Sequence, residues 1–138
     1  SAASDVYKRQ ALARGDWVIC DRFTDSTYAY QGGGRGMSAA LIAQFEDLTL
    51  GDFAPNLTVL LDVPIAIGLT RAAQVGAPDR FESEQHAFFE RARAIFLNRA
   101  QTQKRTQIVD ASQSQSTVKQ SVLSLIEQHW LSVQGDHP

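Results

Sequence analysis

Cysteine is nearly absent from this chain of 138 residues, in which Cys20 is the single example. One cysteine excludes an internal disulfide and a cysteine-based metal cluster, and it fits a reducing compartment. Long hydrophobic runs are also lacking, since no apolar stretch approaches the roughly 20 residues that span a bilayer, and the first residues contain no apolar signal-peptide core. We therefore expect a soluble, cytoplasmic protein.

An excess of positive charge is lacking as well. The chain has 13 basic and 15 acidic residues, for a net charge of −2, so we expect no broad surface for nucleic acid or for an anionic membrane. Hydrophobic residues make up 43% of the chain and charged residues 20%, which is typical of one globular domain. Any phosphate chemistry must then rest on a few well-placed arginines.

Three short apolar runs, each with an aspartate at or near its carboxyl end, predict strands at residues 17–23 (WVICDRF), 57–63 (LTVLLDV) and 106–111 (TQIVDA). Continuous hydrophobicity is typical of strands that are covered on both faces, as in the parallel sheet of an α/β domain. The segments between them predict helices at 38–51, 64–76, within 82–105 and near 117–131. In the first of these helices, Leu41, Phe45 and Leu48 lie on one face.

Doubly wound domains usually carry more than three parallel strands, so we expect that the front of the domain is missing. Residues 1–10 (SAASDVYKRQ) show no clear periodicity. They are expected to be a foreign or disordered extension, with a frayed helix start as the alternative. The domain is expected over residues 11–131, with a tail at 132–138.

Ligands of open α/β sheets bind beyond the carboxyl ends of the strands, where this chain has "DRFTDSTYAYQGGGRG" at residues 21–36. The planar fork of Arg22 matches phosphate oxygens, and the hydroxyl and amide groups that follow suit a base or a sugar. Together they suit a nucleoside monophosphate. The alternative is that Arg22 pairs with Asp21 or with a helix terminus while the tyrosines only pack.

Glycines 32–34 and 36 predict an anion-binding nest or a mobile binding loop, with a flexible linker before Ser38 as the alternative. They do not form a phosphate-binding P-loop, because no glycine in the chain precedes a lysine. The other strand-end acids, Asp62 and Asp110, are interpreted as caps of the helices that follow them.

Residues 71–84 (RAAQVGAPDRFESE) predict a basic segment that closes over phosphates. The alternative is a surface salt bridge from Arg80 to Asp79 or Glu82. The three histidines are scattered, with no aspartate or cysteine at metal-ligand spacing, so no metal-binding residue is assigned.

Taken together, these segments resemble the carboxyl-terminal two-thirds of a bacterial thymidylate kinase over residues 11–130. The stretch 21–36 is similar to the family's Asp-Arg-aromatic signature and its Ser-x-x-Ala-Tyr-Gln continuation, and 54–64 (APNLTVLLDVP), 79–82 (DRFE) and 108–112 (IVDAS) match in the same order. The resemblance implies a partial P-loop nucleoside-monophosphate kinase fold, α/β with a parallel sheet flanked by helices and without the amino-terminal strands. It also implies transfer of the γ-phosphoryl group of ATP to thymidine monophosphate with Mg²⁺, in a homodimer.

By the same resemblance, Arg22 holds the acceptor phosphate, Thr27 faces the thymine edge and Tyr30 lies against the deoxyribose. Ser26 and Gln31 support the loop, and Asp21 lies beside the phosphates and the metal. Arg71 and Arg80 belong to the lid over ATP. Asp21, Arg22 and Arg80 are thus the expected catalytic residues.

The family's P-loop lysine and first strand have no counterpart in this chain, nor do its early aromatic residue and arginine, so we expect little kinase activity from these residues alone. Residues 73–75 (AQV) also stand where many bacterial members have further lid arginines. The alternatives are a fragment of another P-loop nucleotide or metabolite kinase, and a noncatalytic module that binds a nucleotide.

Overall fold

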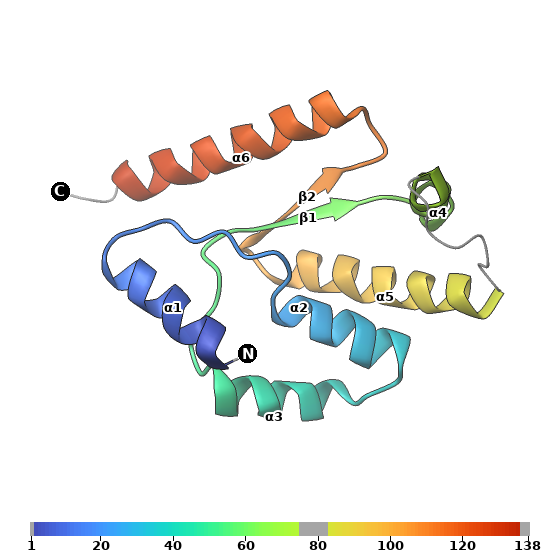
Figure 1. The fold of residues 1–138 in the computed structure, drawn as a ribbon, viewed down its shortest axis with the longest axis horizontal. Helices are drawn as coiled ribbons and strands as arrows, with labels where there is room; N and C mark the ends of the chain where they lie inside the picture. Colours follow the sequence, from blue (N-terminus) through green and yellow to red (C-terminus); the bar gives the residue numbers. More distant parts are fainter. Residues whose placement is uncertain (1, 75–82, 136–138) are drawn as a thin grey trace.

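The computed structural model describes residues 2–74 and 83–135 (Figure 1). Its elements are α1 (Ala2–Ala13), α2 (Thr24–Thr27), the π-helix η1 (Tyr28–Gly34), α3 (Ala39–Thr49), β1 (Thr58–Asp62), α4 (Ile65–Gln74), α5 (Ser83–Thr102), β2 (Thr106–Asp110) and α6 (Gln115–Gly135). Helices therefore flank a small sheet.

The sheet consists of β1 and β2, which pair in parallel from Thr58 opposite Thr106 to Asp62 opposite Asp110. Parallel neighbours need a long crossover, and here α4 and α5 lie between the two strands in the chain. Figure 1 shows α6 on one side of the sheet and α5 on the other. The predicted parallel α/β arrangement and the two predicted strands at 57–63 and 106–111 are confirmed.

The predicted strand at residues 17–23 is wrong for the described part of the chain. Residues 16–20 have no regular secondary structure, and no backbone hydrogen bond connects residues 17–22 to another described segment. Ile19 is 93% exposed. Strand composition alone does not make a strand, because the ladder requires a neighbouring strand to pair with.

Helix α1 runs from Ala2 to Ala13 and so includes residues 2–10 of the segment 1–10, for which the sequence predicts an extension or a frayed helix start. Its Arg9 donates to the carbonyl of Leu50 at 3.0 Å, and the same guanidinium lies 4.1 Å from the centre of the Phe53 ring. These contacts hold α1 against the end of α3. The domain limits at 11 and 131 stay a prediction.

Helix α3 forms where the sequence predicts it, after Ser38 and before Gly51, which has a positive φ of 57°. A different face is packed, however. Ile42 is 3% exposed, whereas Leu48 is 84% exposed and Leu41 and Phe45 are also exposed. The predicted apolar stripe therefore lies on the outer surface of the described structure.

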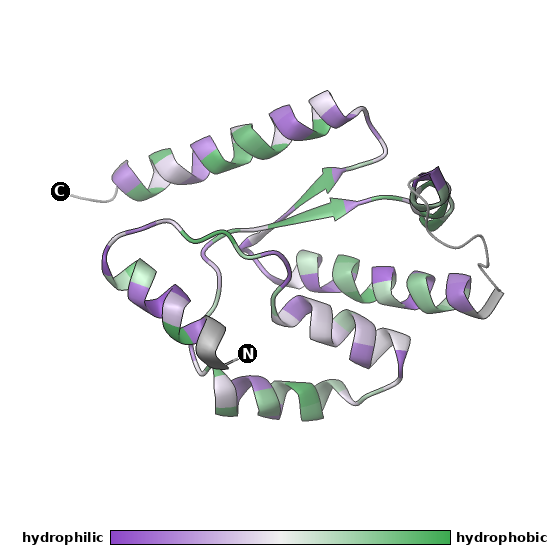
Figure 2. Ribbon diagram, viewed as in Figure 1, coloured by the Kyte–Doolittle hydropathy of each residue, from purple (hydrophilic) through white to green (hydrophobic). Residues whose placement is uncertain are grey.

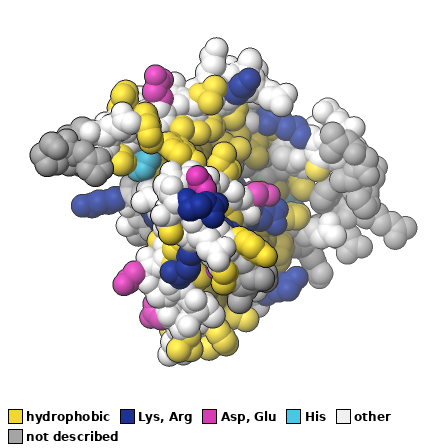
Figure 3. Space-filling model, turned by 60° about the vertical axis from the view of Figure 1, so that its left-hand side comes forward, with side chains coloured by type: hydrophobic (Ala, Val, Ile, Leu, Met, Phe, Trp, Pro, Cys, Tyr) yellow, Lys and Arg dark blue, Asp and Glu magenta, His cyan; other side chains and the backbone are white. Residues whose placement is uncertain are grey.

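The core lies where α5 packs against η1 and the sheet. The buried hydrophobic residues among those described are Ala29, Ile42, Ala92, Ala100 and Val109. Figure 2 shows that β1 is predominantly hydrophobic, and Figure 3 shows hydrophobic side chains gathered on one face of the molecule. On the surface, Trp17 packs against Trp130 of α6 with ring centres 5.3 Å apart and the ring planes tilted by 46°. None of the helices in the described ranges combines the length and the apolar character needed to cross a membrane.

Candidate functional site

The segment after Arg22 is helical, because α2 runs directly into η1. The glycines at the end of η1 are packed against α5. A β-carbon at Gly33 would lie 2.5 Å from Cγ1 of Ile95, and one at Gly34 would overlap the Phe88 ring. Arg91 of α5 donates to the carbonyls of Gly33 and Gly34, each at 3.2 Å.

The predictions of an anion nest, a mobile loop or a linker at glycines 32–34 are therefore wrong. None of the three has a positive φ, so glycine is not needed here for an unusual turn. Its lack of a side chain instead allows η1 to pack closely against α5 at Gly33 and Gly34. Of the four glycines in this stretch, Gly36, just after η1, is the one with the left-handed conformation that favours glycine, with a φ of 78°.

The structure brings Arg22 and Tyr30 together. The guanidinium carbon of Arg22 lies 5.3 Å from the centre of the Tyr30 ring, a cation–π contact. The Tyr30 ring also packs against two phenylalanines of α5, Phe88, stacked with ring centres 6.2 Å apart, and Phe96, edge-on at 5.8 Å. Asp21 and Arg22, both within the described residues, form no ion pair with each other, so this part of the alternative is not observed, whereas the packing of Tyr30 that it also includes is observed.

The remaining acceptor candidates lie on the same helical segment as Tyr30. Thr27 is exposed at the end of α2, while Ser26 and Gln31 are half-buried. Thr27 is the last residue of α2, and Tyr30 and Gln31 follow in η1, so these three residues belong to one continuous helical segment. Together with Arg22, which contacts Tyr30, we call Thr27, Tyr30 and Gln31 the acceptor cluster.

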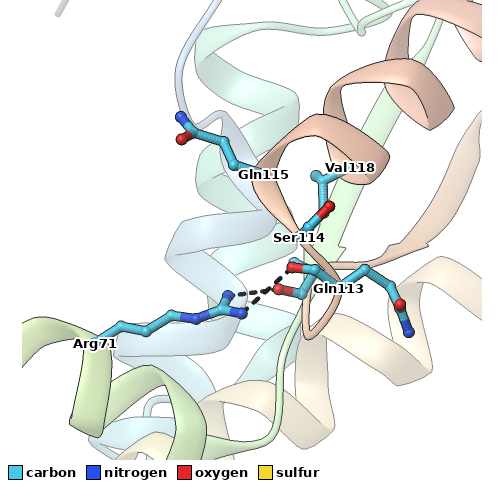
Figure 4. Close-up of a pocket in the computed structure, with 6 residues that line it drawn as sticks. Arg71, Gln113, Ser114, Gln115 and Val118 are labelled. Atoms are coloured by element: carbon cyan, nitrogen blue, oxygen red, sulfur yellow. Dashed lines mark hydrogen bonds between the residues drawn. The ribbon is translucent and has the colours of Figure 1, made fainter.

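Arg71 lies elsewhere, on α4, and faces the loop after β2 (Figure 4). It donates to the carbonyls of Ala111 at 2.5 Å, Ser112 at 2.9 Å and Gln113 at 3.4 Å. An open hollow of about 430 Å³ lies beside this contact, lined by Arg71, Ala111, Gln113, Ser114, Gln115 and Val118. The lining does not include any member of the acceptor cluster.

The interpretation of Asp110 as a cap of the last helix is wrong. Its carboxylate accepts from the backbone and hydroxyl of Ser112, at 2.9 and 2.6 Å, and from the Gln113 amide at 3.0 Å. These bonds, that from Gln113 first, lower the pKa of Asp110 to about 2. The cap of α6 is instead Ser114, whose Oγ accepts from the backbone N–H of Thr117 at 3.2 Å.

The interpretation of Asp62 as a cap of α4 is also wrong. Both of its oxygens accept from Arg93 of α5, at 2.7 and 2.9 Å, and this bond raises the pKa of Arg93. A bidentate pair of this kind fixes the carboxyl end of β1 against α5.

Sequence reasoning missed a group of charged side chains around Asp25. Its carboxylate accepts from Arg99 at 2.7 Å and from Arg105 at 3.0 Å. The partners lie 74 and 80 residues away in the chain, so no local spacing could reveal them. The available signal was one acidic residue within a run of hydroxyl groups.

Two parts of the predicted site remain without a structural description. Arg80 and residues 75–82 of the predicted lid lie outside the described residues, so the lid assignment stays a prediction. The described part of the chain contains no group of three or more His, Cys, Asp and Glu side chains that could hold a metal ion. Asp21, exposed in the bend before α2, is the carboxylate nearest in sequence to the acceptor cluster.

The comparisons with known proteins all identify the same family. The family model described as thymidylate kinase matches residues 2–122. The thymidylate kinase of Pseudomonas syringae pv. tomato is 53% identical over 119 residues, which cover 86% of this chain and 57% of the relative. That of Alcanivorax borkumensis is 49% identical over 121 residues, covering 87% and 58%.

A similar fold is found among solved structures. The crystal structure of thymidylate kinase from Ehrlichia chaffeensis matches with a TM-score of 0.64 and 28% sequence identity, and the match covers 86% of this chain and 54% of the other. The chain thus spans less than two-thirds of the length of each of these relatives.

Proposed function

Because this chain belongs to the thymidylate kinase family, we propose that the protein encoded by its natural gene transfers the γ-phosphoryl group of ATP to thymidine monophosphate. The product is thymidine diphosphate, on the route to thymidine triphosphate. The observation that carries the proposal is the acceptor cluster, in which Arg22 contacts the Tyr30 ring and the Thr27 hydroxyl and the Gln31 amide belong to the same helical segment as Tyr30.

Arg22 is proposed to bind the acceptor phosphate. Phosphoryl transfer depends on positioning and on neutralising oxygen charge far more than on covalent catalysis. A guanidinium supplies charge and two aligned donors, and the contact with Tyr30 limits the directions in which the Arg22 side chain can point.

Tyr30 and Thr27 are proposed to recognise the nucleoside. The Tyr30 ring is held on two sides by Phe88 and Phe96, so it forms a rigid wall against which the deoxyribose packs. A rigid wall rejects an added 2′-hydroxyl by steric contact. The exposed Thr27 hydroxyl is free to donate to or accept from the thymine edge, while Ser26 and Gln31 support the helix.

Arg71 is proposed to bind ATP. Its planar guanidinium borders the hollow of about 430 Å³ at the loop after β2, and a guanidinium plane is a favourable surface for a nucleotide base. Its three carbonyl contacts fix that plane. Arg80 is proposed to complete the lid over the phosphates.

Mg²⁺ is proposed to accompany ATP. It is usually bound by substrate phosphates with one or two carboxylates rather than by an all-protein cage, so a single protein carboxylate is sufficient. The exposed Asp21 carboxylate is the group that would hold it. When bound, Mg²⁺ neutralises charge on the transferred phosphoryl group.

We further propose a cytoplasmic homodimer with no role in binding nucleic acid or membranes. The exposed stripe of Leu41, Phe45 and Leu48 on α3 supports self-association, because neighbouring exposed apolar side chains are typical of protein interfaces. The absence of net positive charge supports the exclusion of nucleic acid.

The printed 138 residues alone are proposed to have little kinase activity. They contain no glycine followed by lysine, so the P-loop sequence whose backbone and lysine cradle ATP phosphates is not among them.

A substrate panel tests the proposed function. The protein expressed from its natural gene is given ATP, Mg²⁺ and each common nucleoside monophosphate, and release of ADP is followed. The expected result is the highest kcat/KM with thymidine monophosphate, together with loss of that activity in Arg22→Lys. Arg14→Lys, which alters an exposed arginine paired with Asp16, is the matched control. Preference for another acceptor would overturn the proposal.

A further inference from the structure

Asp25 occupies a partly buried position in the first turn of α2, directly before Ser26 and Thr27. Its side chain is 13% exposed. Each carboxylate oxygen is bound by a different arginine, Oδ1 by Nε of Arg99 and Oδ2 by Nη2 of Arg105. Helix α2 and the η1 segment that continues it, which together we call the acceptor helix, are thus tied to α5 and to the residue before β2 through a single side chain.

The Arg105 contact leads to the sheet. Arg105 directly precedes β2 and also donates to Oγ1 of Thr58, the first residue of β1. The backbone N–H of Thr58 in turn donates to the carbonyl of Arg105 at 2.9 Å. Arg105 is therefore fixed to the amino ends of both strands. Because it also donates to Asp25, it holds Asp25 at a defined position relative to the sheet.

The Arg99 contact leads to α3. Arg99 lies near the carboxyl end of α5, and its guanidinium carbon is 3.6 Å from the centre of the Tyr28 ring. The Tyr28 hydroxyl donates to Oε2 of Glu46 in α3 at 2.7 Å. Tyr28 follows Asp25 by three residues, so the same arginine holds two successive points of the acceptor helix.

The negative charge of Asp25 is needed to balance the two arginines beside it. One carboxylate lies between two guanidinium groups whose side chains are 18% and 19% exposed. Removing the negative charge would leave two neighbouring positive charges with little solvent screening, which destabilises their present arrangement. The helix start at Thr24 has no side-chain cap at Phe23 to hold it otherwise.

We propose that Asp25 is a positioning residue for the acceptor nucleotide, which sets the orientation of the helix carrying Thr27, Tyr30 and Gln31 relative to the sheet. The inference rests on the proposed function for the identity of the acceptor. It assigns Asp25 no contact with substrate. Arg71 and its hollow lie on other elements, so the effect of Asp25 is confined to the acceptor side.

The test compares Asp25→Asn with Asp25→Glu in the protein expressed from its natural gene. Calorimetry measures the dissociation constants of thymidine monophosphate and of a nonhydrolysable ATP analogue, and thermal melting measures stability. Asp25→Asn is expected to weaken thymidine monophosphate binding by about tenfold, within the usual range of coupling between contacting residues, and ATP-analogue binding by less than about twofold. Asp25→Glu, which keeps the charge, is expected to restore part of the affinity.

Asp5→Asn is the matched control, because it breaks a 2.8 Å ion pair of comparable exposure on α1. It is expected to leave both affinities unchanged. If Asp25→Asn does not fold, Arg105→Gln replaces it, since this variant keeps the Asp25–Arg99 pair and is expected to give a smaller defect confined to the acceptor.

Equal weakening of both ligands, or an unchanged thymidine monophosphate affinity in a folded variant, would overturn the inference. Failure of the unmodified protein to bind or phosphorylate thymidine monophosphate would instead overturn the proposed function. Measuring binding and phosphorylation of thymidine monophosphate by the unmodified protein therefore distinguishes the two failures.

Discussion

The guanidinium of Arg22 faces the ring of Tyr30 at 5.3 Å while the Arg22 backbone adopts a left-handed conformation, with a φ of 62°. Arg22 is the one non-glycine residue with positive φ among the described residues. Such a conformation costs an L-residue roughly 1–2 kcal/mol, and strained residues of this kind concentrate at functional sites. A backbone that lowers the stability of the fold but directs the Arg22 side chain toward Tyr30 is consistent with a functional role for that side chain.

Replacing Arg22 separates its backbone strain from its side-chain contact. Both Arg22→Gly and Arg22→Ala remove the Tyr30 contact, but only glycine relaxes at positive φ. We expect Arg22→Gly to be more stable than Arg22→Ala by about 1 kcal/mol, although both weaken thymidine monophosphate binding equally. Urea unfolding and calorimetry measure the two effects. Equal stability of the variants would contradict the strained backbone.

Adding a methyl group at Gly34 tests the packing of η1 on α5. A β-carbon there would overlap the Phe88 ring, and overpacking of this kind costs about 1–3 kcal/mol. Gly34→Ala is therefore expected to lower the urea midpoint and, by moving Phe88, to disturb Tyr30.

Gly68→Ala is the matched control for that change. The site lies within α4, where a β-carbon would meet Cγ1 of Val63 at an ordinary 3.5 Å. Alanine in a helix interior is expected to stabilise by about 0.5–1 kcal/mol. A change of the urea midpoint in the same direction in both variants would contradict the close packing of Gly34 against Phe88.

We expect the hydrogen bonds of Asp110 to make the free energy of unfolding depend on pH below about pH 4. Hydrogen bonds from Gln113 and Ser112 lower the pKa of Asp110 from 3.8 to about 2 in the folded chain. Because the folded-state value is the lower one, the stability that this carboxylate contributes is present above its unfolded pKa of about 3.9 and is lost as the pH falls through about 2. Carbon-detected NMR titration of the Asp110 carboxyl group measures this directly.

Gln113→Ala supplies the control for the titration, because the Gln113 amide is the largest cause of the shift. We expect the pKa of Asp110 to move back toward its ordinary value in this variant. A midpoint that is the same with and without Gln113 would show that the loop hydrogen bonds are not its cause.

Arg71→Lys tests the proposal that the hollow beside Arg71 binds ATP. Lysine keeps the charge but loses the planar fork that spans the carbonyls of residues 111–113. Binding of an ATP analogue is expected to weaken by about tenfold, with thymidine monophosphate affinity unchanged. Arg22→Lys is expected to show the reverse pattern. If Arg71→Lys and Arg22→Lys weakened the same ligand, the separation of the two sites would be wrong.

The sequence predicted the two paired strands and the four helices that follow residue 36, because their signals are local. Apolar runs and the residues that start and stop helices are visible in a short window of sequence. The strand at residues 17–23 was predicted on the same grounds and was wrong, because pairing depends on a neighbour that composition does not reveal.

The candidate site was predictable only in part. Arg22 was identified by residue type and Tyr30 by the resemblance to the family, and the two do lie together. The role of Gly34 was missed because it depends on Phe88, 54 residues later in the chain, and that of Asp25 because its partners are Arg99 and Arg105. Contacts of this kind have no periodicity. They follow from the packing of α5 against the acceptor helix.

An amide NMR titration of the protein with thymidine monophosphate alone tests whether the acceptor cluster binds this nucleotide. We expect chemical-shift changes concentrated on Arg22, Thr27, Tyr30 and Gln31, smaller changes with thymidine lacking the phosphate, and none of comparable size in the loop of residues 111–114. Changes concentrated at that loop, or an undisturbed acceptor cluster at saturating thymidine monophosphate, would contradict this expectation.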